Sequence, residues 1–265
     1  MTVEYETIIL EKINGVGKIT LNRPDSLNAL NYQCMLDLEA ALADIREDGD
    51  TRCVVITGAG RAFCAGGDTK QMTDQHNWGA VQLKDYVRRF GTVGRDMWEL
   101  EKPIIMAING TAVGGGCNFA LCGDILIASE KAKFAEFFVL RGLMPDFMGI
   151  YTLPKLVGLQ KTKELCFTGD MIDAQEALKI GLVSKVTPHE ELIPTAMALA
   201  TRLATERPPL ALGMTKMLLH KAIELDLRSI LEYEAFGQGL LLQTEDHKEA
   251  VSALFEKRLP KFKGK

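Results

Sequence analysis

The sequence predicts an α/β fold in which short strands alternate with amphipathic helices, followed by a region of helices alone. Two β-branched runs, Cys53 to Thr57 and Ile104 to Ile108, are each followed within two residues by glycine, as expected of strands that lead into a loop. Between them, Val81 to Leu100 mixes charged and apolar residues at helical spacing. The order strand, strand, helix recurs along the chain, and this alternation is typical of α/β proteins.

The first predicted element is a β-hairpin. Tyr5 to Lys12 and Lys18 to Leu21 are rich in residues that favour strands, and the pair Asn14-Gly15 between them suits a tight hairpin turn. Apolar residues then recur at helical spacing from Met35 to Ile45, with acidic residues on the opposite face. An amphipathic helix is therefore expected after the hairpin.

Further strands and helices are predicted in the middle of the chain. Asp124 to Ala128 and the segment around Phe134 favour strands, and Leu153 to Phe167 favours a helix. The next helix, Asp173 to Ile180, carries its own boundary signals, because Asp173 can cap the first turn and Gly181 can end the last one.

The pattern changes near Glu190. Before this point the short run Leu182 to Val186 is a last strand candidate, and after it only helical patterns occur, with a break at Pro208-Pro209. We therefore predict a helical C-terminal region.

Composition narrows the class of protein. The 265 residues are 47% hydrophobic and 25% charged, with a formal net charge of −4 and a pI near 5.7, which is ordinary for a globular protein. Basic residues are scattered rather than clustered, so nucleic acid is not an expected partner. The acidic N-terminus lacks a secretory signal, and no apolar run approaches the roughly 18 to 20 residues that span a bilayer. We expect a soluble, cytoplasmic protein.

The six cysteines and four histidines do not suggest a metal site or a disulfide framework. No C-x-x-C pair occurs, and the histidines show no ligand spacing. We expect free thiols that fill space in the core, no bound metal and no bound cofactor. Cys64 and Cys117 lie in glycine-rich loops, where a reactive thiol is the less favoured alternative.

Two glycine clusters follow predicted strands: Ala65-Gly66-Gly67-Asp68 and Gly114-Gly115-Gly116. The first does not belong to a dinucleotide-binding fingerprint, because Phe63 stands where that motif requires a third glycine. If both loops face one pocket, each can direct one backbone N–H at the same oxygen and so form a pair of donors for an oxyanion. Each cluster taken alone is more often a plain turn.

A set of short motifs is spread over essentially the whole chain. They are Leu21-Asn-Arg23-Pro24 with Asn28-Ala-Leu, Phe63-Cys-Ala65-Gly66-Gly67-Asp68, Lys102-Pro103 with Ile108-Asn109-Gly110, Gly114-Gly-Gly-Cys117, Cys122-Gly-Asp124-Ile, Phe167-Thr168-Gly169, Gly181-Leu-Val183 and Phe255-Glu-Lys257-Arg. In this order and at these spacings the set resembles the crotonase (enoyl-CoA hydratase/isomerase) family.

The resemblance implies a crotonase-like spiral of ββα units followed by a helical C-terminal trimerisation region. On this basis residues 1–195 are expected to form the spiral core with the CoA and active sites, and residues 196–265 the helical region used for oligomerisation. It also implies a homo-oligomer, either a trimer or a hexamer made of two trimers. The expected substrate is an acyl-CoA thioester that carries its own coenzyme A.

The resemblance also implies roles for individual residues. The N–H groups of Gly67 and Gly115 would hold the thioester oxygen as it gains enolate charge. Lys257 would reach a CoA phosphate from the C-terminal helix of a neighbouring subunit, and Phe138 would belong to the wall of the substrate site. Coenzyme A would lie across a set of loop residues, namely Arg23, Asp25, Ala65, Gly66, Asp68 and Lys70. For each charged side chain in this set, a solvated surface residue is the alternative.

Two positions depart from the hydratases of this family. Those enzymes carry glutamates where this chain has Asn118 and Phe138, and neither residue can act as a general acid or base. The two-carboxylate route to hydration therefore lacks its residues. Glu136 lies two residues before Phe138 and would face the same side of an extended strand, so it stays an alternative acid.

Asp146, in the segment Gly142-Leu-Met-Pro145-Asp146-Phe-Met-Gly149, is the favoured catalytic residue. In similar family members, such as dienoyl-CoA and epoxyphenylacetyl-CoA isomerases, an aspartate at this place does the chemistry. Neighbouring phenylalanines and Met148 suggest an apolar wall that would raise the pKa of the aspartate. The alternative is a helix N-cap or turn residue beside Pro145.

One carboxylate and an oxyanion hole suit proton transfer within a single substrate. We therefore expect double-bond isomerisation of an enoyl-CoA, with Asp146 as acid and base. Hydration and a catalytically silent acyl-CoA-binding protein are the alternatives, and ring-modifying isomerisation of an aromatic-derived CoA ester stays open. Dehalogenation ranks low, because Phe138 occupies the place of a required tryptophan and no matching histidine is found. A structural subunit whose glycine loops are only turns is the remaining interpretation.

Overall fold

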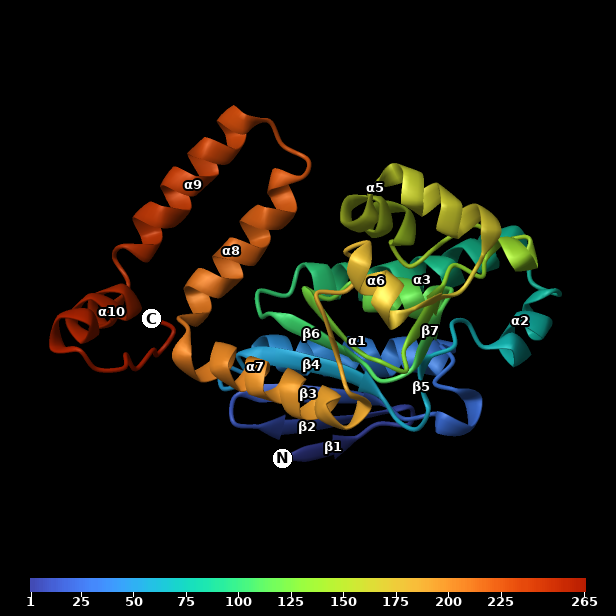
Figure 1. Cartoon of the computed structure of the whole chain (residues 1–265), viewed down its shortest axis with the longest axis horizontal. Helices are drawn as coiled ribbons and strands as arrows, with labels where there is room; N and C mark the ends of the chain where they lie inside the picture. The colour runs from blue at the N-terminus through green and yellow to red at the C-terminus, as the bar shows by residue number, and fades with distance from the viewer.

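The computed structural model describes all residues from 1 to 265 and contains two sheets built from successive strand pairs (Figure 1). The large sheet contains, in spatial order, β1 (Thr2–Glu4), β2 (Ile8–Ile13), β3 (Val16–Leu21), β4 (Cys53–Gly58), β6 (Ile104–Ile108), β8 (Ile125–Ser129) and β11 (Lys185–Thr187). The small sheet contains β10 (Ile172–Asp173), β9 (Lys133–Ala135), β7 (Thr111–Val113) and β5 (Ala62–Cys64).

Strands that follow one another along the middle of the chain alternate between the two sheets. In three consecutive units the first strand (β4, β6 or β8) joins the large sheet and the second (β5, β7 or β9) joins the small one. Within each sheet these strands pair in parallel, so each return requires a crossover segment. The expected spiral of ββα units is therefore confirmed. The predicted hairpin is also confirmed, since β2 and β3 are joined through Asn14 and Gly15, both with positive φ.

Helices cover the sheets and complete each unit. Their bounds are α1 (Tyr32–Glu47), α2 (Thr69–Gln75), α3 (Ala80–Trp98), α4 (Gly115–Ala120), α5 (Gly149–Thr168), α6 (Ala174–Lys179), α7 (Leu192–Glu206), α8 (Pro209–Ala222), α9 (Leu227–Leu241) and α10 (Glu245–Glu256), with 3-10 turns η1 (Pro24–Ser26), η2 (Val139–Arg141) and η3 (His189–Glu191). The boundary signals of α6 are confirmed, because the Asp173 side chain accepts a hydrogen bond from the Glu176 N–H at 2.8 Å and Gly181 has a φ of +81°. None of the helices is both long and apolar enough to cross a membrane.

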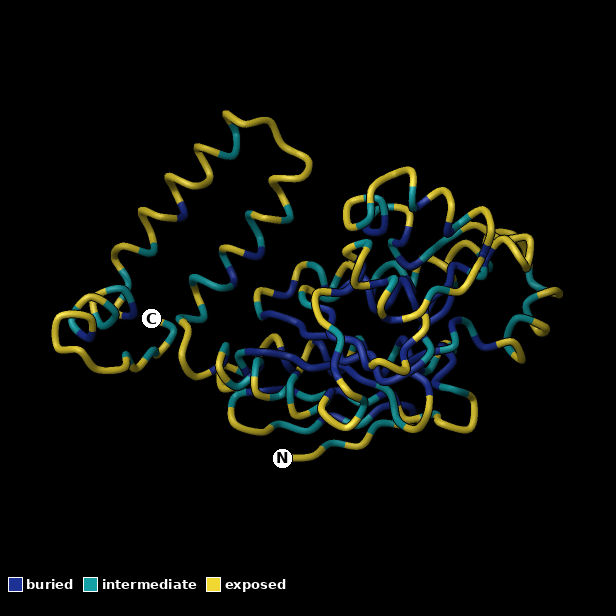
Figure 2. Tube along the Cα trace, in the orientation of Figure 1, coloured by how far each residue is buried: buried dark blue, intermediate teal, exposed yellow.

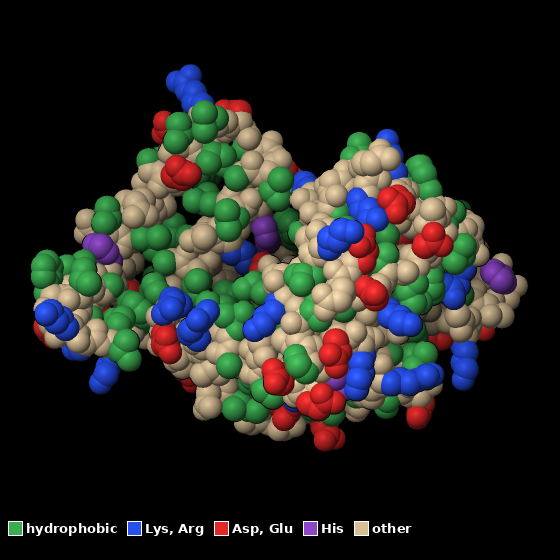
Figure 3. All heavy atoms as spheres, in the orientation of Figure 1, with side chains coloured by type: hydrophobic (Ala, Val, Ile, Leu, Met, Phe, Trp, Pro, Cys, Tyr) green, Lys and Arg blue, Asp and Glu red, His purple; other side chains and the backbone are tan.

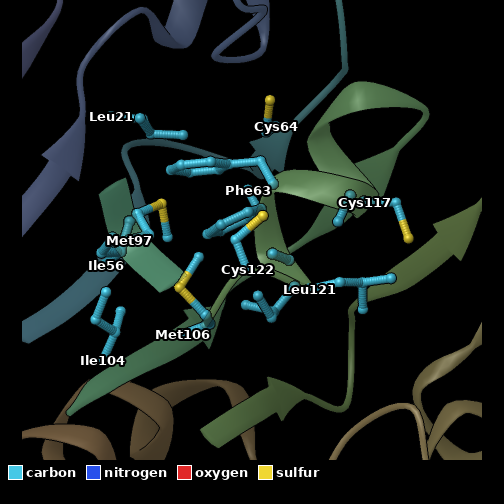
Figure 4. Close-up of a cluster of buried hydrophobic side chains, with 14 of the residues drawn as sticks. Leu21, Ile56, Phe63, Cys64, Met97, Ile104, Met106, Cys117, Leu121 and Cys122 are labelled. Carbon is cyan, nitrogen blue, oxygen red and sulfur yellow. The ribbon is translucent and has the colours of Figure 1, made fainter. Parts of the chain in front are cut away.

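The main core packs apolar side chains from strands of both sheets against several of the helices. Figure 4 shows part of this core, in which Phe63 of β5 and the side chains of Met97, Met106 and Cys122 belong to one buried cluster. Phe63 also stacks on Phe119 of α4, with ring centroids 6.0 Å apart. All six cysteines are free and five are buried, so their predicted role as space-filling residues agrees with the structure.

The opposite face of the large sheet is covered by α7. Its small side chains, Ala196, Ala200 and Ala204, allow close contact with β4 and β6. The predicted division between residues 195 and 196 falls inside this helix. The division into two regions stays a prediction, but α7 belongs by its packing to the core.

Beyond α7 the chain leaves the core. Helices α8, α9 and α10 stand away from the sheets, and α9 is exposed along almost its whole length (Figures 1 and 2). Gly237 is the one buried residue of α9, whereas Phe236 is 74% exposed. A hollow lies between part of this arm and the body (Figure 3), and its lining includes Trp98 and Leu219. The arm still contacts the body through α8, where the buried Lys216 pairs with Asp124 at 2.8 Å. Large exposed apolar surfaces of this kind mark interaction sites, so the arm is well suited to the predicted contacts between subunits.

Candidate active site

Two neighbouring parallel strands bring the glycine clusters together. β5 and β7 pair in the small sheet, so their carboxyl ends meet at the same edge. β5 leads through residues 65–68 into α2, and β7 leads through Gly114 into α4. Both clusters thus stand at strand-to-helix junctions, as the sequence indicated. The strands that directly precede them are β5 and β7, however, which the sequence patterns did not predict, whereas the predicted strands are β4 and β6.

The two loops touch through their backbones. A Cβ atom on Gly66, which has a φ of +86°, would lie 2.7 Å from the carbonyl oxygen of Val113, and a Cβ on Gly116 would collide with the carbonyl of Cys64. Such contacts are possible only where both residues lack a side chain. The glycines are therefore required for the two loops to approach one another, and not merely for the turns themselves.

Two backbone N–H groups are left free at this contact. The Gly67 N–H makes no backbone hydrogen bond, and Gly115 is the first residue of α4, where an N–H has no partner within the helix. A Cβ on Gly115 would lie 3.9 Å from the Gly67 nitrogen and 3.8 Å from Oδ1 of Asp146. The structure therefore brings Gly67, Gly115 and Asp146 around one small space.

Asp146 is held in a tight loop before α5. The next two residues, Phe147 and Met148, both have positive φ (48° and 63°), which non-glycine residues adopt rarely. Met148 is the N-cap of α5, and the Asp146 carboxylate makes no hydrogen bond to another residue. Asp146 is therefore not the helix cap of the alternative interpretation, but it does begin a turn, because its carbonyl accepts from the Gly149 N–H at 2.8 Å.

The environment of Asp146 changes its acidity. Burial raises the pKa of this carboxyl group to about 6, and its own backbone N–H offsets part of the rise. A carboxyl group with this pKa is mostly ionised at pH 7, but its pKa is close enough to 7 for it to accept a proton transiently during a reaction. The predicted upward shift thus agrees with the structure.

The two positions that hold glutamates in the hydratases contain neutral side chains. Asn118 of α4 is fully buried and donates a hydrogen bond from Nδ2 to the carbonyl of Asp146 at 2.9 Å. Phe138 is buried, and its ring lies near Gly114, where an added Cβ would be 3.9 Å from the ring. Phe147 does not form the expected wall beside Asp146. It points into the core, where its ring meets Phe90 and Phe119 at 5.9 and 5.5 Å between centroids.

Glu136 lies behind Asn118, just after β9. The residue is 2% exposed, and neither carboxyl oxygen has a hydrogen-bond partner. Burial raises its pKa to about 8, and the nearby side chains of Cys117 and Asn118 lower it in part. The remaining surroundings are apolar and include Phe134 and Leu153. Glu136 is therefore an acid within the protein interior.

Comparison with known proteins agrees with this geometry. The family described as enoyl-CoA hydratase/isomerase matches residues 11–265. The short-chain-enoyl-CoA hydratase of Clostridium acetobutylicum is 37% identical over 97% of both chains, and the 1,2-epoxyphenylacetyl-CoA isomerase of Escherichia coli is 38% identical over 98% of this chain and 99% of that protein. A crystal structure of a putative enoyl-CoA hydratase from Streptomyces coelicolor superimposes with a TM-score of 0.95 at 37% identity, covering 99% of this chain and 96% of that one.

The chain belongs to the enoyl-CoA hydratase/isomerase family. Its fold is the crotonase fold, and it is an enzyme of that family. The resemblance found in the sequence motifs is confirmed over nearly the whole chain.

Two residues expected at the CoA site of this family member form an ion pair. Arg23 donates from its guanidinium to Oδ2 of Asp68 at 2.8 Å and also to the carbonyl of Ala29. Asp68 caps α2 by accepting from the Lys70 N–H at 3.0 Å. Burial opposes the charge of Asp68, but the hydrogen bonds from Arg23 and the backbone lower its pKa overall. Both side chains thus already have partners within the chain.

The other residues expected to contact CoA differ in position. The Ala65 N–H donates to the carbonyl of Leu27 at 3.0 Å, next to the Arg23 and Asp68 pair. Asp25 and the Lys70 side chain are exposed beside these loops and make no ion pair. Lys257 follows α10, at the far end of the molecule from β5 and α2 (Figure 1). One chain therefore does not bring Lys257 to its own site.

Sequence reasoning missed a group of aromatic residues near Asp68 and Asp146. Tyr86 and Phe90 of α3 pack 4.9 Å apart between ring centroids, and Trp78 meets Tyr86 edge-on at 5.6 Å. Burial raises the pKa of Tyr86 to about 12, the Gln75 side chain lowers it in part, and the charges of Asp68 and Asp146 add to the rise. The i, i+4 spacing of Tyr86 and Phe90 was a usable signal for one aromatic face of this helix.

Proposed function

We propose that this enzyme moves a double bond within an enoyl-CoA thioester, using Asp146 as both acid and base. The observation that carries the proposal is the position of the Asp146 carboxylate. It has no hydrogen-bond partner in another residue and shares one space with the free N–H groups of Gly67 and Gly115. An acid left unpaired in a partly apolar loop costs stability, so a functional role explains why it is there.

The proposed reaction begins with ionised Asp146. Its carboxylate takes a proton from the substrate carbon conjugated to the thioester, and the electron pair moves through the carbon chain to the thioester oxygen. The N–H groups of Gly67 and Gly115 donate hydrogen bonds to the enolate oxygen and lower the energy of this intermediate. Asp146 then returns the same proton to a different carbon, so the product has the mass of the substrate.

Hydration is the less supported reaction. It requires one group to activate water and another to deliver a proton, and the family's two positions for these groups are Asn118 and Phe138. Named relatives do not separate the two reactions, because hydratases and an isomerase are 37–38% identical to this chain. The local chemistry of the site is therefore the better guide to the reaction.

We further propose how coenzyme A and other copies of the chain take part. CoA would lie along the loops that carry Arg23, Asp25, Ala65, Gly66, Asp68 and Lys70. Lys257 would act on the CoA of a neighbouring subunit, which requires a homo-oligomer. The exposed apolar residues of α8 and α9 would be buried in that assembly.

A screen of CoA thioesters tests this function. Each substrate is incubated with the enzyme and followed by mass spectrometry and ultraviolet absorbance, which separate hydration from isomerisation. The proposal expects a product of unchanged mass with altered absorbance. Gain of one water would support hydratase activity instead, and saturable binding without any product would support a silent acyl-CoA-binding protein.

A further inference from the structure

Two buried hydrogen-bond acceptors lie side by side behind the proposed catalytic residue. Asn118 is 0% exposed and Glu136 is 2% exposed, and neither Oδ1 of Asn118 nor either carboxyl oxygen of Glu136 has a partner. The orientation of the Asn118 amide is fixed by chemistry. Its other end meets the carbonyl of Asp146 at 2.9 Å, and a carbonyl can only accept, so Nδ2 must be at that end.

An arrangement of unpaired acceptors in the protein interior is unfavourable. Each buried polar group without a partner has lost its hydrogen bonds to water and gained none in return, which destabilises the fold. An ionised Glu136 and the Asn118 oxygen would also repel each other, because both carry negative charge density. One proton on Glu136 removes both problems, since a neutral carboxylic acid has one O–H donor.

We propose that Glu136 is a positioning residue for Asp146: as a neutral acid it donates its O–H to Oδ1 of Asn118, and Nδ2 of Asn118 donates to the Asp146 carbonyl. This inference rests on the proposed function of Asp146. Glu136 does not touch the substrate in this arrangement and transfers no proton to it. Its effect is to fix the amide that anchors the catalytic loop.

The loop needs such an anchor. Phe147 and Met148 both have positive φ, a conformation that strains the backbone of residues other than glycine. The Asp146 carbonyl accepts from Asn118 Nδ2 and from the Gly149 N–H at 2.8 Å. A Cβ on Gly149 would collide with the Asn118 side chain, so the amide is packed directly against the loop.

The charges around Glu136 favour its neutral form. Burial raises its pKa to about 8, the Cys117 and Asn118 side chains lower it in part, and the negative charge of Asp146 adds to the rise. The other titratable groups that face it are the thiols of Cys117 in α4 and Cys166 in α5. Burial raises the pKa of both thiols, that of Cys166 to about 11, and the charge of Glu136 adds to the rise, so both stay neutral. The Cys117 S–H is therefore a weak donor toward Glu136. Glu136 is therefore a donor near pH 7 and becomes an acceptor as the pH rises through about 8.

Variants at position 136 test the relay through the pH dependence of turnover. Wild-type kcat should fall as the pH rises above about 8. Glu136→Gln supplies an N–H donor at every pH, so it should keep the neutral-pH kcat and lose this alkaline fall. Glu136→Leu supplies no donor and should lower kcat roughly 10- to 100-fold with little change in KM, because the catalytic loop is displaced. Glu130→Gln, at an exposed position after β8, is the matched control and should behave as wild type.

Three results would overturn the relay. Loss of turnover in Glu136→Gln at all pH values would make Glu136 itself a proton carrier. An alkaline fall that persists in Glu136→Gln, or a wild-type kcat in Glu136→Leu, would show that Glu136 does not position the loop.

Infrared spectroscopy separates failure of the relay from failure of the proposed function. At pH 7 the wild-type protein should show the carbonyl stretch of a hydrogen-bonded carboxylic acid that is lost in Glu136→Gln and shifts to higher frequency in Asn118→Ala. This readout needs no substrate and no role for Asp146. If the band is absent, the relay is wrong, whatever Asp146 does. If the band is present but Asp146→Asn turns over normally, the proposed function is wrong and the relay has only a structural role.

Discussion

The segment after β9 and the loop before α5 each place one acid beside Asn118, but at different depths. Glu136 in the first segment is enclosed by the core, whereas Asp146 in the second is half-buried beside the two glycine loops. Burial raises the pKa of both groups, Glu136 to about 8 and Asp146 to about 6. The same physical effect therefore yields a neutral donor in one region and a base close to neutrality in the other.

A third acid shows what a partner changes. Asp68 is also buried, at 8% exposed, yet its pKa is lowered, because hydrogen bonds from Arg23 and the backbone outweigh the effect of burial. Burial alone therefore does not decide whether an acid is charged. How deeply the acid is buried decides whether it can contact a substrate, and its hydrogen-bond partners decide whether it stays ionised.

The largest effect on turnover is expected when Asp146, the acid that can contact the substrate, is replaced by a neutral amide. Asp146→Asn keeps the shape of the side chain but cannot exchange a proton at neutral pH, so kcat should fall roughly 10²- to 10⁴-fold. Thioester affinity, measured by calorimetry, should be retained. Asp170→Asn, at an exposed position after α5, is the control. Turnover of Asp146→Asn within a few-fold of wild type would contradict the assignment.

Filling the space between the acid and the N–H pair should have the next largest effect. The methyl group of Gly115→Ala would lie 3.8 Å from Asp146 Oδ1 and 3.9 Å from the Gly67 nitrogen, in ordinary contact, so the fold should tolerate it. The methyl group would occupy the space in which the thioester oxygen binds the two N–H groups, so kcat/KM should fall roughly 10²- to 10³-fold. Gly91→Ala adds the same group on α3 where nothing lies within 4 Å, and its activity should match wild type. Equal activities of the two variants would argue against the oxyanion site.

Replacing an acid by its neutral amide should raise the free energy of unfolding where the acid is unpaired, and lower it where the acid is in an ion pair. A raised pKa means that the folded state loses stability as the pH rises from the unfolded pKa to the folded one. Glu136→Gln should therefore be more stable than wild type above about pH 5, with a gain that grows until about pH 8 and reaches the order of a few kcal/mol. Asp146→Asn should gain less and level off near pH 6. Denaturant unfolding at several pH values measures both curves, and a pH-independent gain would count against the assigned states.

The smallest expected effect is a loss of stability, in contrast with the gains expected for Glu136→Gln and Asp146→Asn. Asp68→Asn keeps an N-cap for α2 but loses the charge that pairs with Arg23, so it should lower stability by about 1 kcal/mol near pH 7. Because the pKa of Asp68 is lowered in the folded state, its contribution is present above the unfolded pKa and disappears as the pH falls through the folded one. The two unfolding curves should converge in acid, and stabilisation by Asp68→Asn would contradict this account.

Much of the fold follows from residues that are adjacent in sequence. The Asn14-Gly15 hairpin and the caps of α6 depend on local chemistry, and both were predicted. The strand β1 (Thr2–Glu4) was missed because three residues are too few to show a period. The helix α2 (Thr69–Gln75) was missed because it buries no side chain and so has no apolar stripe.

The site was predicted only in part, because its remaining features depend on contacts between distant segments. The strand, glycine, helix order predicted the facing N–H groups of Gly67 and Gly115, and the motif around Asp146 predicted its place. The inward direction of Phe147 depends on its positive φ, which no local signal announced. The neutral state of Glu136 depends on its enclosure by Asn118 and the core, which periodicity could not show.

Deuterium oxide gives the most direct test of the central claim that Asp146, and not Glu136, exchanges protons with the substrate. The enzyme is incubated in deuterium oxide with an enoyl-CoA that it isomerises, and deuterium in substrate and product is followed by mass spectrometry. We expect wild type and Glu136→Gln at pH 7 to form isomerised product at similar rates and with the same deuterium content, and Asp146→Asn to form none and to leave the substrate unlabelled. Isomerisation that is lost in Glu136→Gln and retained in Asp146→Asn would contradict the account.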